Sequence, residues 1–94
     1  MTKRDLVIRI ATETGISQRE VNEVVQRTFD HILNELASGR GVELRNFGVF
    51  MLSQRKGRLG RNPQKPKSTV EIPGRTIVKF KPGKNMREKV AKLD

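Results

Sequence analysis

Hydrophobic residues recur at three- and four-residue spacing along the first 38 positions, which is the period of an amphipathic helix. One stripe consists of Leu6, Val7, Ile10 and Ala11, and a second of Val21, Val24, Val25, Thr28, Phe29, Ile32, Leu33 and Leu36. Thr2-x-x-Asp5 and Ser17-x-x-Glu20 have capping-box spacing and mark where the two helices begin. Gly15 is a natural end for the first helix, and Gly39 and Gly41 are natural ends for the second. The pattern predicts helices over about residues 3–14 and 18–38.

The hydrophobic period changes to two after Gly41. Val42 and Leu44 alternate with polar residues, a tight turn follows at 46–48, and an apolar run continues over 49–52. Alternation returns over 75–81, and a last helical pattern covers about 84–92. This order of elements predicts an α+β fold with a helical body, a three-stranded antiparallel sheet and a C-terminal helix.

Residues 53–73 differ from the rest of the chain, because only Leu59, Val70 and Ile72 among them are hydrophobic. Glycine and proline interrupt the segment, and its cations are Arg55, Lys56, Arg58, Arg61, Lys65 and Lys67. Such a composition buries too little apolar surface to join a core. Since strands flank the segment, we predict a long β-ribbon arm that reaches on the order of 30 Å from the sheet.

The positive charge of the chain is concentrated in its second half. The 94 residues carry 20 Lys and Arg against 10 Asp and Glu, a net charge of +10. Residues 1–41 hold six residues of each sign, so the whole excess lies in 42–94. A one-sided positive field attracts polyanions, and the composition therefore favours a nucleic-acid-binding protein.

Composition also excludes several classes of function. Cysteine is absent, so disulfides and cysteine–zinc sites are excluded. His31 is the only histidine, which excludes a histidine metal cluster within one chain, and we assign it no role. No apolar run is long enough to span a bilayer, and the N-terminus lacks the apolar stretch of a signal peptide. We expect no enzyme activity, cofactor, metal, small-molecule substrate or membrane partner.

Two motifs are candidates for DNA contact. Gly60-Arg61-Asn62-Pro63 combines side chains that can read minor-groove acceptors with a rigid apolar proline that can wedge between base pairs. Lys84 and Arg87 lie at the start of the last predicted helix, where positive charge opposes the helix dipole. That cost is explained if these side chains and the free N–H groups bind a phosphate.

The apolar face of the second predicted helix is wide for so small a chain. The four phenylalanines add further bulk that three helices and a small sheet are not expected to enclose. A twofold partner would bury this surface and would place two arms symmetrically, so we expect a dimer.

Two other interpretations are weaker. The segment from Ala11 to Ser17 resembles a helix-turn-helix, but residues 17–38 carry a net charge of −2 and would repel phosphates. A single-strand or RNA-binding protein would need aromatic stacking platforms, and the basic segment contains no aromatic residue. This second class stays as an alternative to duplex binding.

The chain as a whole resembles the HU/integration host factor family of bacterial histone-like DNA-bending proteins. The motifs that carry the resemblance are Gly15-Ile16-Ser17, Phe47-Gly48-Val49-Phe50, Gly60-Arg61-Asn62-Pro63, Ile72-Pro73 and Phe80-Lys81-Pro82-Gly83-Lys84. The resemblance implies an intertwined dimer whose helices form a body, whose strands form a saddle, and whose two β-arms wrap double-stranded DNA in the minor groove. The expected location is the nucleoid in the bacterial cytoplasm.

The resemblance also implies roles for single residues. A single domain would comprise a dimerisation body at 1–41, a saddle sheet at 42–52 and 74–82, a DNA-binding β-arm at 53–73 and a C-terminal helix at 83–94. The implied DNA-binding residues are Lys3, Asn46, Arg55, Lys56, Arg58, Arg61, Asn62, Pro63, Arg75, Lys84 and Arg87. Pro63 would be the wedge. The implied dimer interface and core are Phe29, Ile32, Leu36, Leu44, Phe47, Phe50 and Phe80.

The predicted function is an architectural protein that bends and compacts duplex DNA with little reading of base sequence. A sequence-specific bender of the integration-host-factor type is the alternative within the family. Either function is compatible with a homodimer or a heterodimer. Three positions depart from the family pattern: Asn46 replaces a usual glycine, Lys65-Pro66 replaces Thr-Gly, and one residue is added before Ile72-Pro73. Asparagine tolerates a left-handed backbone, so the turn at Asn46 is expected to survive.

Overall fold

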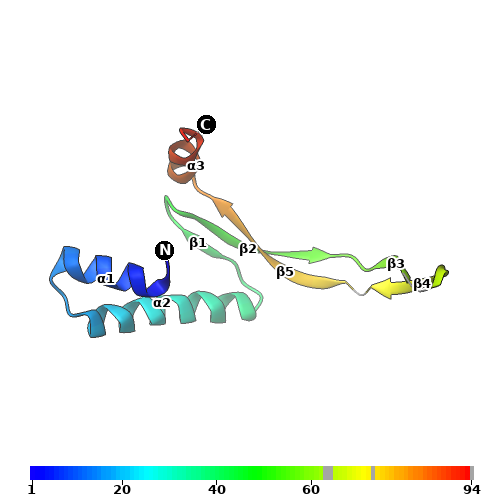
Figure 1. The fold of residues 1–94 in the computed structure, drawn as a ribbon, viewed down its shortest axis with the longest axis horizontal. Helices are drawn as coiled ribbons and strands as arrows, with labels where there is room; N and C mark the ends of the chain where they lie inside the picture. Colours follow the sequence, from blue (N-terminus) through cyan, green and yellow to red (C-terminus); the bar gives the residue numbers. More distant parts are fainter. Residues whose placement is uncertain (63–64, 73, 94) are drawn as a thin grey trace.

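The protein consists of a helical body, a small sheet and a β-ribbon arm that extends away from both (Figure 1). The computed structural model describes the backbone of residues 1–62, 65–72 and 74–93, and the side chains of residues 1–57 and 74–93. The longest axis measures 63 Å and the radius of gyration is 19.7 Å, against about 12 Å for a compact domain of this length. The arm makes the molecule this long.

Two helices, α1 (Lys3–Thr14) and α2 (Gln18–Ala37), form the body, as the sequence predicts. The Thr2 hydroxyl accepts the N–H of Asp5, whose carboxylate accepts the N–H of Thr2, so the predicted capping box of α1 is present. The Ser17 hydroxyl accepts the N–H of Glu20 and caps α2. Gly15 ends α1 with a φ of 75°, in the left-handed region that favours glycine.

The two helices bury only a small core. Val7 and Ala11 of α1 pack against Val21 and Val25 of α2, and these are the buried hydrophobic residues of the described part of the chain. The C-terminal half of α2 approaches the sheet but is not enclosed by it. Much of the apolar surface of α2 is therefore uncovered within a single chain.

Strands β1 (Val42–Leu44), β2 (Gly48–Arg55) and β5 (Arg75–Pro82) form an antiparallel sheet in the order β1-β2-β5. Asn46 turns the chain between β1 and β2 with a φ of 67°, which confirms that asparagine supports a left-handed turn here. Gly48 begins β2 beneath the ring of Phe80: a Cβ at Gly48 would lie 2.5 Å from Cζ of that ring. This position therefore requires glycine.

The arm continues from the sheet as a second antiparallel ladder. Strands β3 (Arg58–Asn62) and β4 (Lys65–Ile72) pair with each other, so the hairpin expected from residues 53–73 is present. Strand β2 runs on through Arg55, beyond the strand predicted to end at 52, because residues 53–55 pair with residues 75–77. Backbone groups form this ladder, so the polar side chains do not interrupt it.

Helix α3 (Lys84–Ala91) follows β5 and stands apart from α1 and α2 (Figure 1). The N–H of Gly83 donates to the carbonyl of Phe47 at 2.8 Å, which fixes the start of α3 against the turn between β1 and β2. Among the described residues, none of the helices is long and apolar enough to cross a membrane.

Candidate nucleic-acid interface

Strands β2 and β5 form a ribbon with two chemically different faces. Residues paired directly across an antiparallel ladder share a face, and the face alternates along each strand. The pairs Phe50↔Phe80 and Leu52↔Val78 make one face apolar. The ring centroids of Phe50 and Phe80 lie 4.9 Å apart, in agreement with this register.

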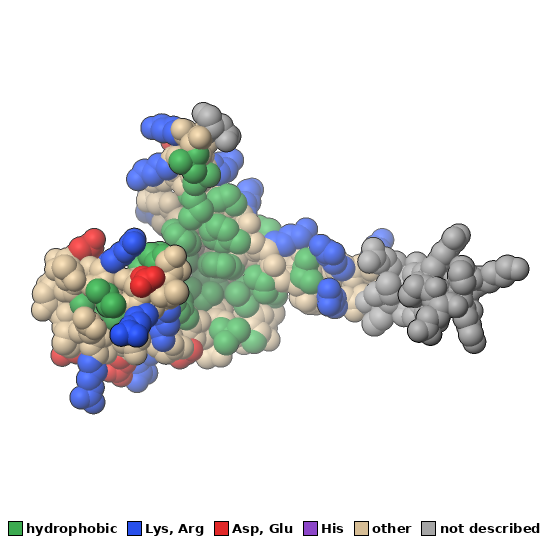
Figure 2. All heavy atoms as spheres, in the orientation of Figure 1, with side chains coloured by type: hydrophobic (Ala, Val, Ile, Leu, Met, Phe, Trp, Pro, Cys, Tyr) green, Lys and Arg blue, Asp and Glu red, His purple; other side chains and the backbone are tan. Residues whose placement is uncertain are grey.

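The opposite face of the ribbon carries a row of four cations, here named the cationic row: Arg55, Arg75, Lys79 and Lys81. All four side chains are exposed. Acidic side chains are absent from residues 48–55 and 75–82, which are fully described, so nothing within the ribbon neutralises the row. Figure 2 shows Lys and Arg side chains along the ribbon where it leaves the body.

The end of the cationic row places like charges directly opposite each other. Arg55 pairs with Arg75 at the last step of the ladder before the arm. Cβ atoms of such pairs lie about 4.5–5.5 Å apart, and like charges at this distance destabilise a ribbon. An anion lying between the two guanidinium groups would remove the repulsion. The arrangement is therefore typical of a surface that binds phosphates.

The sequence prediction included Arg55 and Arg75 but missed Lys79 and Lys81. The signal was present, because Lys79 and Lys81 alternate with apolar residues in the predicted strand over 75–81. Exposed Lys56 directly follows β2 at the base of the arm. Strand β3 contains Arg58, Arg61 and Asn62. Pro63 lies outside the described residues.

A second group of predicted residues meets at the start of α3. The turn at Asn46 and the start of α3 are adjacent, because a Cβ at Gly83 would lie 3.3 Å from the carbonyl carbon of Asn46. Lys84 and Arg87 occupy the first turn of α3, and both are exposed. The Lys84 ammonium lies 3.9 Å from Glu88, a solvated pair that adds little to stability. The structure thus brings Asn46 beside the basic start of α3.

Lys3 is separate from both groups and lies on the helical body. Its Nζ donates to Oε1 of Gln26, and Nε2 of Gln26 donates in turn to Oδ1 of Asp30 at 2.8 Å. Gln26 has no charge, so the bond to Lys3 leaves the ammonium its full charge. A phosphate can displace Gln26 from Lys3 while Gln26 keeps its bond to Asp30.

We expect Gln26→Glu to weaken DNA binding. A carboxylate at this position would form an ion pair with Lys3, which a phosphate would have to break. Losing one phosphate contact per chain lowers the slope of log affinity against log salt by about 1 per chain. Gln18→Glu is the matched control, since it adds the same charge to α2 at its first residue, about two turns away from Gln26. Equal effects of the two variants in a salt titration would contradict a role for Lys3.

The predicted interface residues surround one apolar groove. Its volume is about 530 Å³, and it lies between the C-terminal half of α2 and the sheet. The residues lining this apolar groove are Thr28, Phe29, Ile32, Leu33, Leu36, Leu44, Phe47, Phe50 and Val78. The ring of Phe80 packs at a tilted angle against the rings of Phe50 and Phe47, which line the groove. Leu33 is 64% exposed and Phe47 is 49% exposed, so the groove is open in a single chain.

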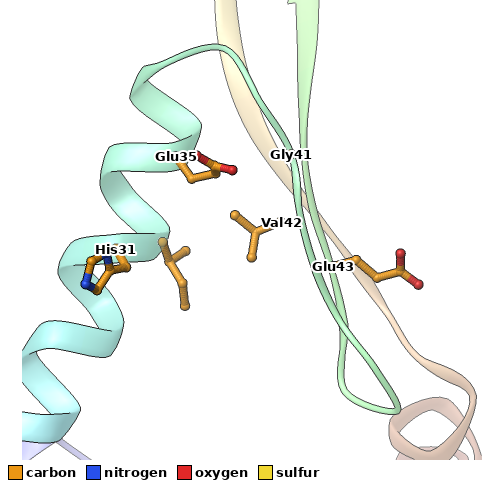
Figure 3. A pocket seen from close by; sticks show the side chains of 6 residues that line it. His31, Glu35, Gly41, Val42 and Glu43 are labelled. Atoms are coloured by element: carbon orange, nitrogen blue, oxygen red, sulfur yellow. The ribbon is translucent and has the colours of Figure 1, made fainter.

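A second groove, between α2 and β1, offers no site for a metal. Figure 3 shows His31 and Glu35 on α2 and Glu43 on β1, with Glu43 pointing away from the helix. The Arg40 guanidinium donates a 2.8 Å hydrogen bond to Glu35 and lowers the pKa of that carboxyl. Within the described residues, no cluster of three His, Asp or Glu could hold a metal ion.

Comparisons with known proteins agree with this geometry. The sequence model of the family described as "Bacterial DNA-binding protein" matches residues 1–91. Integration host factor subunit beta of Vibrio cholerae is 41% identical, over 96% of this chain and 98% of that protein. The same subunit of Vibrio parahaemolyticus is 43% identical, over 96% of this chain and 97% of that protein.

Solved structures show the same fold. The Anabaena HU–DNA cocrystal structure matches with a TM-score of 0.87 and 35% identity, over 97% of this chain and 98% of that one. A V42I mutant of HU from Thermotoga maritima matches with a TM-score of 0.71 and 29% identity, over 96% and 99% of the two chains. The chain therefore belongs to the HU/integration host factor family of bacterial DNA-binding architectural proteins, which are not enzymes.

Proposed function

We propose that this protein bends and compacts double-stranded DNA with little reading of base sequence. The observation that carries the proposal is the cationic row, which runs along one face of the β2–β5 ribbon toward the arm. Its four exposed cations would follow a phosphate backbone, and phosphate contacts supply most sequence-independent affinity. The protein then acts in the nucleoid of the bacterial cytoplasm.

The arm extends this surface into the minor groove. Arg58, Arg61 and Asn62 on β3 would contact the groove or its phosphates, and Pro63 would open a base step. Unstacking costs about a few kcal/mol per step, a general magnitude for minor-groove wedge proteins, of which this family is itself an example. Bending a site by 40–90° costs roughly 1–6 kcal/mol. Phosphate contacts along the ribbon and at Lys3, Lys84 and Arg87 would offset both costs.

The binding unit is a dimer, most simply of two identical chains. The apolar groove exposes large side chains that a second copy would cover. The groove and the cationic row are on opposite faces of the ribbon, so a partner on one face leaves the other open to DNA. Two chains related by a twofold axis would place their arms symmetrically on a duplex.

Replacing Pro63 with alanine tests the wedge. We expect Pro63→Ala to reduce DNA bending strongly and to change affinity little, because the substitution keeps every cation. Fluorescence transfer between the ends of a short duplex measures the bend, and fluorescence anisotropy measures affinity. Pro73→Ala removes a proline from the other end of the arm and serves as control. A bend that Pro63→Ala leaves unchanged refutes the wedge.

A sequence-specific bender is the second candidate, favoured by the identity of 41–43% to integration host factor beta subunits. Competition among random, mismatched and candidate specific duplexes separates the two, since only a specific binder prefers one intact sequence strongly. Single-strand binding has less support. Phe29, Phe47 and Phe50 line the apolar groove, and Phe80 shares the face of Phe50 on the ribbon. No phenylalanine therefore shares a face with the cationic row as a base platform.

A further inference from the structure

The face of the β2–β5 ribbon that carries the cationic row also carries apolar residues. Val49 of β2 pairs directly with Lys81 of β5. Two residues further along, Met51 pairs with Lys79, so both apolar side chains share the face of the cations. Ile77 of β5 is on the same face, diagonal to Met51 across the ladder. Val49, Met51 and Ile77 are all half-buried, and we name them the apolar strip.

The apolar strip faces away from the core of the single chain. An antiparallel sheet that has one face in water ordinarily places polar residues on that face and apolar residues on the face that packs on the core. The ribbon already has an apolar face of this kind, on which Phe50 and Val78 line the apolar groove. The apolar strip is on the opposite face, between the cations. Such a surface fits a ligand that carries both negative charge and apolar groups.

A nucleic-acid backbone is a ligand of this kind, because its phosphates alternate with sugars that present carbon atoms. Residues paired across an antiparallel ladder have Cβ atoms about 4.5–5.5 Å apart. A phosphate bound by Lys81 would therefore place the adjoining sugar near Val49. The pair of Met51 and Lys79 repeats this arrangement two residues further along. The apolar strip and the cationic row together match the alternation of sugar and phosphate.

The two kinds of duplex differ at the sugar. RNA carries a 2′-hydroxyl that DNA lacks, and proteins use this group to distinguish the two nucleic acids. A ribose hydroxyl buried against valine or methionine has no hydrogen-bond partner, and an unsatisfied buried polar group costs free energy. Cations alone attract both nucleic acids, because both carry phosphates.

We propose that the apolar strip packs against the deoxyribose of duplex DNA and makes the protein bind DNA more tightly than an RNA duplex of the same sequence. This inference rests on the proposed function, because it assumes that the cationic row binds the phosphates of a duplex. The cationic row supplies affinity for either backbone, and the apolar strip supplies the preference for DNA.

Two double variants test the apolar strip without changing any charge. Val49→Thr with Met51→Gln keeps the approximate size of both side chains and gives each a polar group that can bond a ribose hydroxyl. Val49→Ile with Met51→Leu is the matched control, because it changes the same positions and keeps them apolar. Circular dichroism and thermal unfolding verify that each variant is folded, and sedimentation compares its oligomeric state with that of the native protein.

Fluorescence anisotropy gives the affinity of each protein for a DNA duplex and for an RNA duplex of the same sequence. We expect the native protein and the apolar control to prefer DNA, and the polar variant to lose at least about tenfold of that preference. The slope of log affinity against log salt for DNA will stay the same, because no cation is removed. A 2′-fluoro RNA duplex keeps the A-form shape and lacks the hydroxyl, so the native protein will bind it more tightly than RNA.

A polar variant that keeps the native preference for DNA overturns the inference, and so does an apolar control that loses the preference equally. Native protein that binds the 2′-fluoro duplex no better than RNA also overturns it, because the shape of the duplex would then explain the preference. If the polar variant dissociates into single chains, the apolar strip is a contact between chains instead.

Fluorescence transfer on the same DNA duplex separates this inference from the proposed function. If the native protein bends DNA and the polar variant keeps the preference, only the role of the apolar strip fails. If the native protein does not bend DNA, the proposed function fails, and the inference fails with it.

Discussion

Replacing Arg55, Arg75, Lys79 and Lys81 together by glutamine will lower the affinity for duplex DNA by roughly 10²–10⁴-fold at low salt. All four side chains are exposed on one face of the ribbon, and the described ribbon residues provide no acidic neighbour to neutralise them. Each lost phosphate contact reduces counterion release. The slope of log affinity against log salt concentration will therefore become shallower by about 1 for each replaced residue in each chain. Salt titrations by anisotropy measure both effects.

The unfolding temperature of the quadruple variant will distinguish an electrostatic role of the four cations from a structural one. The pair Arg55↔Arg75 places like charges opposite each other, so the quadruple variant is expected to unfold at the same temperature or a higher one. The control replaces Arg9, Arg19, Arg27 and Arg40 of the helical body by glutamine, which removes the same charge. A control that weakens binding as much would mean that net charge, rather than the row, attracts DNA.

Local chemistry explains why much of the fold was predictable from sequence. The capping box of Thr2 and Asp5 and the positive φ of Gly15 involve neighbours in sequence, and both are visible in the residue types. The two faces of β5 follow from alternation alone. The apolar groove was predictable because the chain has more large apolar side chains than so small a core can enclose. Phe29 and Phe47 are among them, and both are exposed.

Features that depend on pairing between distant residues were not predictable in the same way. The register shift between Arg61 and Asn62 in the arm depends on which residues of β3 and β4 are partners, and residue type alone does not fix that register. The bond between Lys3 and Gln26 joins residues 23 positions apart and depends on how α1 packs on α2. For Lys79 and Lys81, part of the signal was visible, because they alternate with apolar residues along the sequence. Only the pairing of β5 with β2 places them in one row with Arg55.

The apolar groove leaves large side chains exposed, which accounts for the small core of the single chain. Leu33→Glu will dissociate the dimer and abolish tight DNA binding. Burying a leucine contributes about 1.5–3 kcal/mol. The proposed homodimer would contain the residue twice at its twofold interface, so about 3–6 kcal/mol would be lost. This corresponds to a dimer weakened by roughly 10²–10⁴-fold. Sedimentation at several protein concentrations measures the dissociation.

Asn34→Glu is the control, because it places the same charge at the next residue of α2, which does not line the apolar groove. We expect this variant to remain a dimer and to bind DNA normally. If Leu33→Glu also sediments as a dimer with normal affinity, the groove is not the dimer interface. Loss of DNA binding on dissociation would show that one cationic row cannot hold a bent duplex alone, since a single chain contributes half of the phosphate contacts and only one arm.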